Sequence, residues 1–393
     1  MASSHSYCDS QWSVCRRALS LSHTIMIQGT ASGVGKSVVV AGLCRLLARE
    51  GVRVAPFKPQ NMSNNAAVTA DGGEIGRAQA LQAFACGIDP TIDMNPVLIK
   101  PEADHCAQLI VHGRVAGRLQ AKRFRQDRIA LLNRVMDSFT TLHEHYDVVV
   151  VEGAGSPAEP NLRAGDIANM GFAEEADLPV WLLGDIDRGG VFAALKGSLD
   201  LLTPSEHNRV EALLINRFRG DRSLLDDALL WLKRATGKPL AGLIPWLPLQ
   251  LPEEDSPCQQ LQSGSHSANH FHIAVIAYPR ISNHDDFDPL QSDSQIALRF
   301  INHPDELQPA DLVILPGSKH VTADLLWLRE QQFPAALAKH LRYGGRVLGI
   351  CGGLQMLGER IEDHGVEGES VDGLGWLPIK TTMQRHKVVR QID

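Results

Sequence analysis

The sequence lacks the features that mark disulfide-stabilised, zinc-ribbon and membrane-spanning proteins. Its 393 residues include seven cysteines, and none of these lies in a C-x-x-C pair, so neither a disulfide framework nor a zinc ribbon is expected. No apolar run approaches the roughly 18 residues that a transmembrane helix needs. The apolar stretch after Arg16 and Arg17 spans residues 18–21 and is too short for a signal peptide. We therefore expect a cytoplasmic protein with no membrane partner.

Positive charge is also in short supply. The chain has 38 lysines and arginines against 45 aspartates and glutamates, which gives a net charge of −7. This balance argues against a general nucleic-acid binder, so no nucleic-acid partner is expected. The 44% of apolar residues is ordinary for a globular protein, and at roughly 150 residues per domain the length suggests two or three domains. The composition leaves the oligomeric state open.

Short apolar runs rich in β-branched residues alternate with helical patterns along the chain. Continuous apolar strands that alternate with helices predict a parallel sheet covered on both faces, an α/β fold. The runs of the first half cover residues 24–28, 52–57, 148–151, 180–183, 213–215 and 240–244, with helical patterns over 36–49 and 118–145. A second α/β series has runs at 273–278, 312–315 and 347–350.

The composition also predicts the domain boundaries. We expect a disordered extension over residues 1–23 and a first α/β domain over 24–247. Residues 248–270 are rich in proline, glutamine, serine and acidic residues, which is typical of a linker. A second α/β domain then covers residues 271–393.

A glycine-rich stretch from Gly29 to Ser37 follows the first predicted strand and opens the first predicted helix. This is the context of a phosphate-binding loop, in which backbone N–H groups at glycines such as Gly33 and Gly35, with a helix N-terminus, cradle phosphate oxygens. Lys36 would neutralise the β- and γ-phosphates of ATP, and the Ser37 hydroxyl would bind Mg²⁺. The alternative, a glycine-rich turn without a ligand, does not account for the adjoining Gly-Lys-Ser.

The spacing of this loop narrows its class. Five residues, rather than the usual four, separate Gly29 from Gly35. The longer loop resembles that of dethiobiotin synthetase and its relatives. The partition-type ATPases have a similar loop but carry a signature lysine where this chain has Ala31, which counts against a cytoskeletal or membrane-cycling ATPase.

Charged residues follow three other predicted strands, at the sheet edge where ligands bind in such folds. Glu152 closes its strand and is a natural second Mg²⁺ ligand, the alternative being a strand-end carboxylate that faces water. Lys58 ends the second strand and could meet an acidic substrate. Asp185 and Asp187, with Arg188, predict a polar catalytic rim, although as isolated features they fit turn chemistry equally well.

The second half contains a candidate nucleophile. Cys351 lies between a predicted strand and a predicted helix, where the helix dipole favours the thiolate. Flanking glycines let a substrate carbonyl approach, as in strand–nucleophile–helix elbows, and they favour this interpretation over a small core cysteine. A turn containing Gly317 follows the preceding strand. Its N–H groups, with that of Gly352, could form an oxyanion hole.

Together these residues resemble the cobyric acid synthase family, the glutamine-dependent amidotransferases of cobalamin biosynthesis. The resemblance runs from about residue 26 to about residue 383. It rests on residues 28–37, 58–62, 71–79, 151–159, 184–193, 215–221, 279–283, 286–290, 315–319 and 349–356. It implies a P-loop, dethiobiotin-synthetase-like ATP-binding amidoligase domain with a parallel sheet, followed by a class I glutamine amidotransferase α/β domain.

The resemblance also implies a reaction and further site residues. The family amidates the b, d, e and g carboxylates of adenosylcobyrinic acid a,c-diamide to give adenosylcobyric acid. It uses ATP, Mg²⁺ and ammonia, which comes from glutamine or from free solution. Phosphorylation of each carboxylate would give an acyl phosphate that ammonia attacks. By similarity Asn216 reads adenine and Glu74 is a further Mg²⁺ ligand.

Three alternatives stay open at this point. The first is a ligase like cobyrinic acid a,c-diamide synthase, although residues 58–62, 185–193 and 216–221 favour the cobyric branch. The second is a plain ATPase or kinase-like ligase with a vestigial second domain. The third is a non-catalytic nucleotide-binding fragment that needs a partner for glutaminase activity.

The end of the sequence departs from the family pattern. In the family, the glutaminase domain continues to a catalytic histidine that has an acidic residue two positions later. Only His364 and His386 follow Cys351, and neither has such a neighbour. We therefore expect a truncated, impaired glutaminase domain, in a chain that uses free ammonia but not glutamine at a useful rate.

Overall fold

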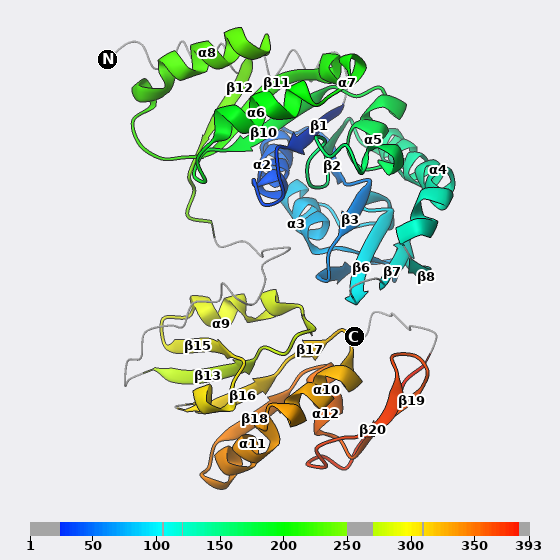
Figure 1. Ribbon diagram of the computed structural model, residues 1–393, viewed down its shortest axis with the longest axis vertical. Helices are drawn as coiled ribbons and strands as arrows, with labels where there is room; N and C mark the ends of the chain where they lie inside the picture. Colours follow the sequence, from blue (N-terminus) through cyan, green and yellow to red (C-terminus); the bar gives the residue numbers. More distant parts are fainter. Residues whose placement is uncertain (1–23, 104–105, 120, 250–269, 309, 385–393) are drawn as a thin grey trace. The chain divides into compact units, whose positions relative to one another are not determined.

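The computed structural model describes residues 24–384 apart from residues 104–105, 120, 250–269 and 309 (Figure 1). The chain divides into two compact units, with the division between residues 251 and 252. The predicted extension over residues 1–23 and most of the predicted linker lie outside the described residues. The two units are described separately.

The first unit is built on a six-stranded parallel sheet. Its order is β12-β11-β10-β1-β9-β2, and every neighbouring pair is parallel. The six predicted apolar runs form these strands: β1 (Thr24–Gly29), β2 (Val54–Phe57), β9 (Val148–Glu152), β10 (Val180–Asp185), β11 (Val210–Phe218) and β12 (Leu240–Pro245). Strand order reverses at β1, so the carboxyl ends of β1 and its neighbours form the crevice in which ligands bind in such sheets.

Helices cover both faces of this sheet, which explains why its strands are continuously apolar. Ile25 and Ile27 of β1 pack with α2 (Lys36–Arg49), whereas Met26 points into a second apolar cluster. That second cluster includes Phe139 of α4 (Ala121–His145). The other α-helices among the described residues of this unit are α3 (Arg77–Cys86), α5 (Met170–Glu175), α6 (Val191–Asp200), α7 (Pro204–Arg209) and α8 (Asp226–Thr236).

An insertion between β2 and β9 forms two small sheets that the sequence patterns did not predict. One has the order β3-β6-β7-β8 and the other pairs β4 with β5. Their bounds are β3 (Gln60–Met62), β4 (Ala66–Val68), β5 (Glu74–Gly76), β6 (Val97–Ala103), β7 (Cys106–Val111) and β8 (Arg114–Leu119). The helix predicted over residues 118–145 begins at Ala121, because residues 114–119 pair with β7 as an antiparallel strand.

The second unit contains a four-stranded parallel sheet of order β15-β13-β16-β18. The three predicted runs form β13 (Phe271–Ile276), β16 (Leu312–Leu315) and β18 (Arg346–Gly349), and β15 (Ile296–Ile301) was not predicted. Helices α10 (Val321–Glu330), α11 (Phe333–Arg342) and α12 (Gly352–Leu357) pack on its core. Shorter elements complete the unit: α9 (Asp288–Ser292), β14 (Ile281–Ser282), β17 (Gly317–Ser318), β19 (Arg360–His364), β20 (Glu369–Asp372) and β21 (Lys380–Thr382).

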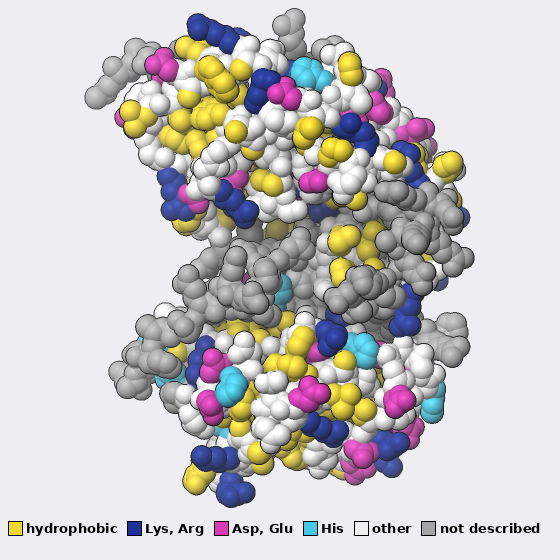
Figure 2. Space-filling model, in the orientation of Figure 1, with side chains coloured by type: hydrophobic (Ala, Val, Ile, Leu, Met, Phe, Trp, Pro, Cys, Tyr) yellow, Lys and Arg dark blue, Asp and Glu magenta, His cyan; other side chains and the backbone are white. Residues whose placement is uncertain are grey.

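The surface agrees with the charge balance of the sequence. On the face shown in Figure 2, lysine and arginine side chains lie interspersed with aspartate and glutamate side chains. No helix within the described residues combines the length and the apolar character needed to cross a membrane.

Candidate functional site

The glycine-rich loop joins β1 to α2 at the carboxyl edge of the first sheet. Gly33 and Gly35 have φ angles of +71° and +96°, a region that favours glycine. A Cβ atom on Gly35 would lie 2.3 Å from Asn216 Nδ2. Asn216, near the end of β11, donates from this nitrogen to the carbonyl oxygen of Val34 at 2.9 Å. Asn216 therefore supports the loop, and its predicted contact with adenine stays a prediction.

The buried side chain of Lys36 folds back over this loop. Its Nζ donates to the carbonyl oxygens of Ala31 at 3.0 Å and Gly155 at 2.8 Å. Gly155 belongs to the segment that follows β9, so the ammonium joins the loop to the neighbouring strand end. This is the position from which a lysine can reach phosphate oxygens bound in the loop.

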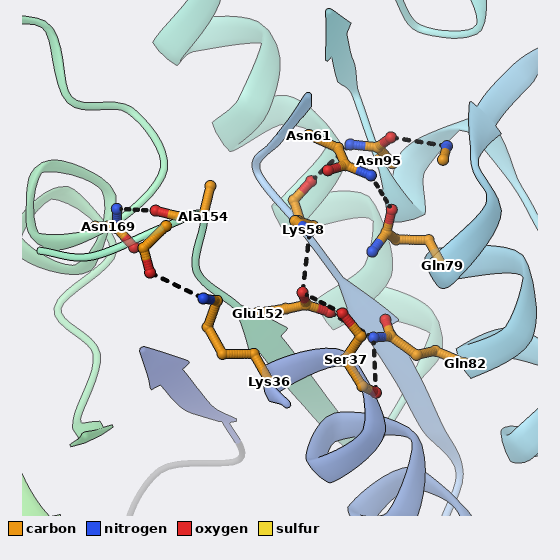
Figure 3. Close-up of polar contacts among 12 residues, drawn as sticks. Lys36, Ser37, Lys58, Asn61, Gln79, Gln82, Asn95, Glu152, Ala154 and Asn169 are labelled. Carbon is orange, nitrogen blue, oxygen red and sulfur yellow. Dashed lines mark hydrogen bonds and ion pairs between the residues drawn. The ribbon is translucent and has the colours of Figure 1, made fainter. Parts of the chain in front are cut away.

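Two residues predicted from separate segments, Ser37 and Lys58, meet at the fully buried carboxylate of Glu152 (Figure 3). Glu152 Oε1 accepts hydrogen bonds from Ser37 Oγ at 2.8 Å and from Lys58 Nζ at 3.0 Å. Its Oε2 accepts one from Gln82 Nε2 at 2.5 Å. Gln82 lies on α3 and was not predicted from the sequence. We call Ser37, Lys58, Gln82 and Glu152 the carboxylate cluster.

The carboxylate cluster keeps Glu152 ionised. Burial acts to raise the pKa of Glu152, but the Lys58 ammonium and the hydrogen bonds from Gln82, Lys58 and Ser37 outweigh it, so its pKa lies below the ordinary value. A carboxylate that is charged at neutral pH can neutralise a cation.

The cluster has the donor chemistry that Mg²⁺ prefers. A serine hydroxyl and a carboxylate are hard oxygen ligands, and Mg²⁺ usually takes one or two carboxylates together with substrate phosphates and water. Within the described residues, no group of three or more His, Cys, Asp or Glu side chains could hold a metal alone. Ser37 and Glu152 therefore fit a Mg²⁺ ion whose remaining ligands come from a bound nucleotide.

Glu152→Gln is expected to weaken the Mg²⁺ dependence of activity, because the swap keeps the shape and removes the charge. It also breaks the buried ion pair with Lys58, so we expect a lower free energy of unfolding, by up to about 3–5 kcal/mol. Mg²⁺ titrations of ATP-dependent turnover and thermal unfolding measure the two effects. Glu152→Asp retains the charge and is the control; an unchanged Mg²⁺ titration in Glu152→Gln would remove the residue from the metal site.

Glu74, the further predicted metal ligand, forms a buried ion pair with Lys100. Glu74 lies on β5 and Lys100 on β6, both in the insertion. The two side chains form a second buried lysine–glutamate pair, in addition to that of Lys58 and Glu152. The ion pair neutralises the Glu74 carboxylate without a metal. The metal role of Glu74 therefore stays a prediction.

A network of buried amides extends from the carboxylate cluster into the insertion (Figure 3). Asn95 Nδ2 donates to the carbonyl oxygen of Lys58 at 3.1 Å, and Asn61 Nδ2 donates to Gln79 Oε1 at 3.0 Å. Gln79 Nε2 is buried without a partner. Gln79 and Gln82 are three residues apart and lie on one face of α3. This spacing would have predicted that both face the site, but only if α3 had also been predicted to pack beside the sheet.

The two predicted rim aspartates hold arginines. The buried Asp185 contacts Arg217 Nη1 at 2.7 Å and Arg188 Nε at 3.5 Å. Asp187 pairs with Arg219 at 3.1 Å. These contacts make the end of β10 a basic rim in which the carboxylates anchor guanidinium groups, and a catalytic role for Asp185 and Asp187 stays a prediction.

In the second unit, Cys351 occupies a strained turn between β18 and α12. Its φ of 51° and ψ of −112° are unusual for a residue with a side chain. The residue is exposed. A Cβ atom on Gly317 would lie 3.9 Å from Cys351 Cβ, and one on Gly352 would lie 3.0 Å from the backbone nitrogen of Ser318. The predicted nucleophile and the two predicted oxyanion glycines thus come together, in the arrangement of a nucleophile elbow.

Contacts of two buried side chains that the sequence analysis did not single out as site residues, Asp324 and Tyr278, hold the turn near Cys351. Ser318 Oγ donates to Asp324 Oδ2 at 2.6 Å, and Arg280 pairs with Asp324 at 3.5 Å. Burial raises the pKa of Asp324. The Tyr278 hydroxyl donates to the carbonyl oxygen of Pro316, and burial raises its pKa as well. These contacts fix residues 316–318 against the elbow.

Gly353→Ala is expected to destabilise the second unit, because a Cβ atom there would lie 1.9 Å from the carbonyl oxygen of Leu315. Such overpacking costs about 1–3 kcal/mol or more in unfolding free energy. Gly368→Ala is the matched control, since its Cβ would meet its nearest atoms at 3.6 and 3.8 Å. Denaturant unfolding of both variants checks the prediction, and equal stabilities would contradict the geometry of the turn.

Of the two histidines that follow Cys351, the structure describes one. His364 is exposed at the end of β19. His386 lies outside the described residues.

A known protein family matches each of the two units. The CobQ/CobB/MinD/ParA nucleotide binding domain family matches residues 25–257. The CobB/CobQ-like glutamine amidotransferase domain family matches residues 272–393. The predicted α/β fold class, a P-loop domain followed by a glutamine amidotransferase domain, is confirmed.

Weak likenesses to solved structures do not define the fold further. The MinD cell division protein of Aquifex aeolicus is 14% identical with a TM-score of 0.33, over 57% of this chain and 83% of that one. The signal recognition particle receptor FtsY of Elizabethkingia anophelis, in complex with GDP, is 14% identical with a TM-score of 0.31, over 55% of each chain.

A curated relative is far more similar. Cobyric acid synthase of Halorhodospira halophila (strain DSM 244 / SL1) is 60% identical over 372 residues, which cover 94% of this chain and 77% of the relative. With its nucleotide-binding and glutamine amidotransferase domains, the chain belongs to the cobyric acid synthase family of glutamine-dependent ligases.

Proposed function

We propose that the protein uses ATP to amidate the b, d, e and g carboxylates of adenosylcobyrinic acid a,c-diamide, giving adenosylcobyric acid. The observation that carries this proposal is the carboxylate cluster beside the phosphate loop, in which Ser37 and Lys58 share one oxygen of Glu152. The corrinoid, ATP with Mg²⁺, and glutamine or free ammonia are the substrates. The identity of the corrinoid rests on the family.

The first step activates a carboxylate, which by itself is a poor electrophile for ammonia. A carboxylate oxygen attacks the γ-phosphorus of ATP, the bond to the β-phosphate oxygen breaks, and an acyl phosphate and ADP result. Ammonia then adds to the acyl carbon and phosphate leaves, with loss of a proton. The protein mainly positions the reactants and neutralises charge, for which Lys36 at the loop and Lys58 at the cluster are suited.

Sharing of Glu152 suggests how metal and substrate binding are linked. In the structure, Lys58 occupies the same carboxylate oxygen as the Ser37 hydroxyl. A Mg²⁺ ion held by Ser37 and Glu152 would compete with Lys58 for this oxygen. Lys58, at the end of β2 beside the phosphate loop, is the group that would meet the carboxylate of the corrinoid.

The second unit would supply ammonia. The Cys351 thiolate attacks the side-chain amide of glutamine, and N–H groups at Gly317 and Gly352 stabilise the tetrahedral oxyanion. The proton that the thiol gives up on becoming a thiolate is returned to the leaving nitrogen, so ammonia departs as the thioester forms. Water then hydrolyses the thioester, which releases glutamate and regenerates the thiol.

Amidation assays with purified protein test this function. We expect ATP and Mg²⁺ to support stepwise amidation of the a,c-diamide, with mass spectrometry counting the amides formed. Hydroxylamine in place of ammonia should trap the acyl phosphate as a hydroxamate. Amidation of cobyrinic acid at its a and c positions instead would point to an a,c-diamide synthase. ATP hydrolysis without amide formation would point to a plain ATPase.

A further inference from the structure

Arg188 lies against the phosphate loop although it belongs to a different segment. It is in the turn between β10 and α6. Its Nη2 would be 3.1 Å from a Cβ atom placed on Gly33, and its Cζ would be 3.9 Å away. The guanidinium group therefore stands over the part of the loop whose backbone, under the proposed function, binds the phosphates of ATP.

The positive charge of Arg188 is only partly balanced by the acidic side chain that it contacts, Asp185. Asp185 is buried and carries one negative charge, but it serves two guanidinium groups. The contact with Arg217 is short, at 2.7 Å, whereas the contact with Arg188 is 3.5 Å, longer than a typical charge-assisted hydrogen bond. One carboxylate cannot compensate both arginines, so an excess positive charge remains at the edge of the phosphate loop.

The backbone at Arg188 is fixed while its side chain is free to turn. The backbone nitrogen of Asp187 donates to Asp185 Oδ1 at 3.0 Å, and that of Gly189 donates to the carbonyl oxygen of Ile186 at 3.1 Å. Gly189 and Gly190 have φ angles of +77° and +71°, which complete the turn into α6. The Arg188 side chain is 65% exposed, so its guanidinium group can leave Asp185 without unpacking a core.

We propose that Arg188 binds the terminal phosphates of the nucleotide, and that Asp185 holds it beside the loop until the nucleotide arrives. The inference rests on the proposed function, since it requires ATP in the loop. A guanidinium group offers a planar fork of donors that matches two phosphate oxygens at once. It would neutralise charge on the β- or γ-phosphate during phosphoryl transfer, in addition to Lys36 and Mg²⁺.

The test compares Arg188→Ala and Arg188→Lys with Arg53→Ala in the full chain. Arg53 is a matched control: its side chain is 67% exposed and pairs with Asp147 at the amino-terminal edge of the sheet, where β2 and β9 begin. Calorimetry gives the dissociation constants of Mg·ATP and Mg·ADP, and turnover with ammonia gives KM for ATP and kcat.

We expect Arg188→Ala to weaken Mg·ATP binding by about 10- to 100-fold, the worth of one charge-assisted hydrogen bond. A γ-phosphate contact leaves Mg·ADP binding unchanged, and a β-phosphate contact weakens both. Arg188→Lys keeps the charge but loses the fork, so a smaller loss is expected, and it serves as the test if the alanine variant does not fold.

Other outcomes would contradict either the role of Arg188 or the proposed function on which it rests, and the experiment distinguishes the two. Binding of Mg·ATP and Mg·ADP within twofold of the unsubstituted protein in both Arg188 variants, while Lys36→Ala abolishes binding, would overturn the role of Arg188 alone. No binding of Mg·ATP by the unsubstituted protein would overturn the proposed function itself. Equal losses in Arg53→Ala and Arg188→Ala would also overturn the inference, because the effect would not be local to the loop.

Discussion

Lys36→Ala is expected to slow amide formation strongly with glutamine and with free ammonia alike, because both nitrogen sources need the phosphorylated carboxylate. Lys36 is buried and its Nζ is held over the phosphate loop by the carbonyl oxygens of Ala31 and Gly155. By analogy with single oxyanion donors, losing one charged phosphate contact in a closed site costs about 2–4 kcal/mol of transition-state stabilisation. That corresponds to a rate lower by roughly 30- to 1,000-fold.

The experiment measures amide formation with saturating ammonia, so that the second unit plays no part. Lys233→Ala is the control, since Lys233 is an exposed lysine on α8. Thermal unfolding of both variants would show whether loss of the buried Lys36 disturbs the loop. Ammonia-dependent turnover near the unsubstituted rate in Lys36→Ala would contradict the assignment of the phosphate loop.

The sequence predicted the main sheet well for a physical reason. Strands buried on both faces need continuous apolar residues, so runs such as residues 148–151 and 180–183 stand out from their surroundings. The insertion between β2 and β9 gave no such signal. Its strands are mixed in character, as Gln60–Met62 and Arg114–Leu119 show, and their pairing depends on contacts between distant segments.

The candidate site was predictable where topology alone brings residues together. The carboxyl ends of parallel strands meet at one edge, so Lys58 and Glu152 could be expected near Ser37. Gln82 and the amides of Asn61 and Asn95 could not, because they depend on how the insertion packs beside that edge.

Cys351 shows the same division within the second unit. Its turn could be predicted from flanking glycines, since the strained backbone needs neighbours without side chains. The contact of Asp324 with Ser318 could not, because it depends on where α10 begins relative to the turn after β16.

Cys351→Ala is expected to separate the two nitrogen sources. Any release of glutamate from glutamine, even at the low rate expected of an impaired glutaminase domain, should depend wholly on this thiol, because the exposed, strained turn presents it beside Gly317 and Gly352. Loss of a catalytic nucleophile lowers turnover by up to about 10⁶-fold. Amidation with free ammonia should stay within about twofold of the unsubstituted protein, since Lys36 and the carboxylate cluster belong to the other unit.

Cys351→Ser sharpens the test, because it keeps the size of the side chain and replaces the thiol by a hydroxyl that is scarcely ionised at neutral pH. Both variants should fold as the unsubstituted protein does, since the side chain is exposed. Glutamate release and amide formation are measured in parallel, with and without ATP and the corrinoid. Glutamate release that persists in both variants would show that another group attacks glutamine. Loss of ammonia-dependent amidation would show instead that the elbow supports the synthetase reaction directly.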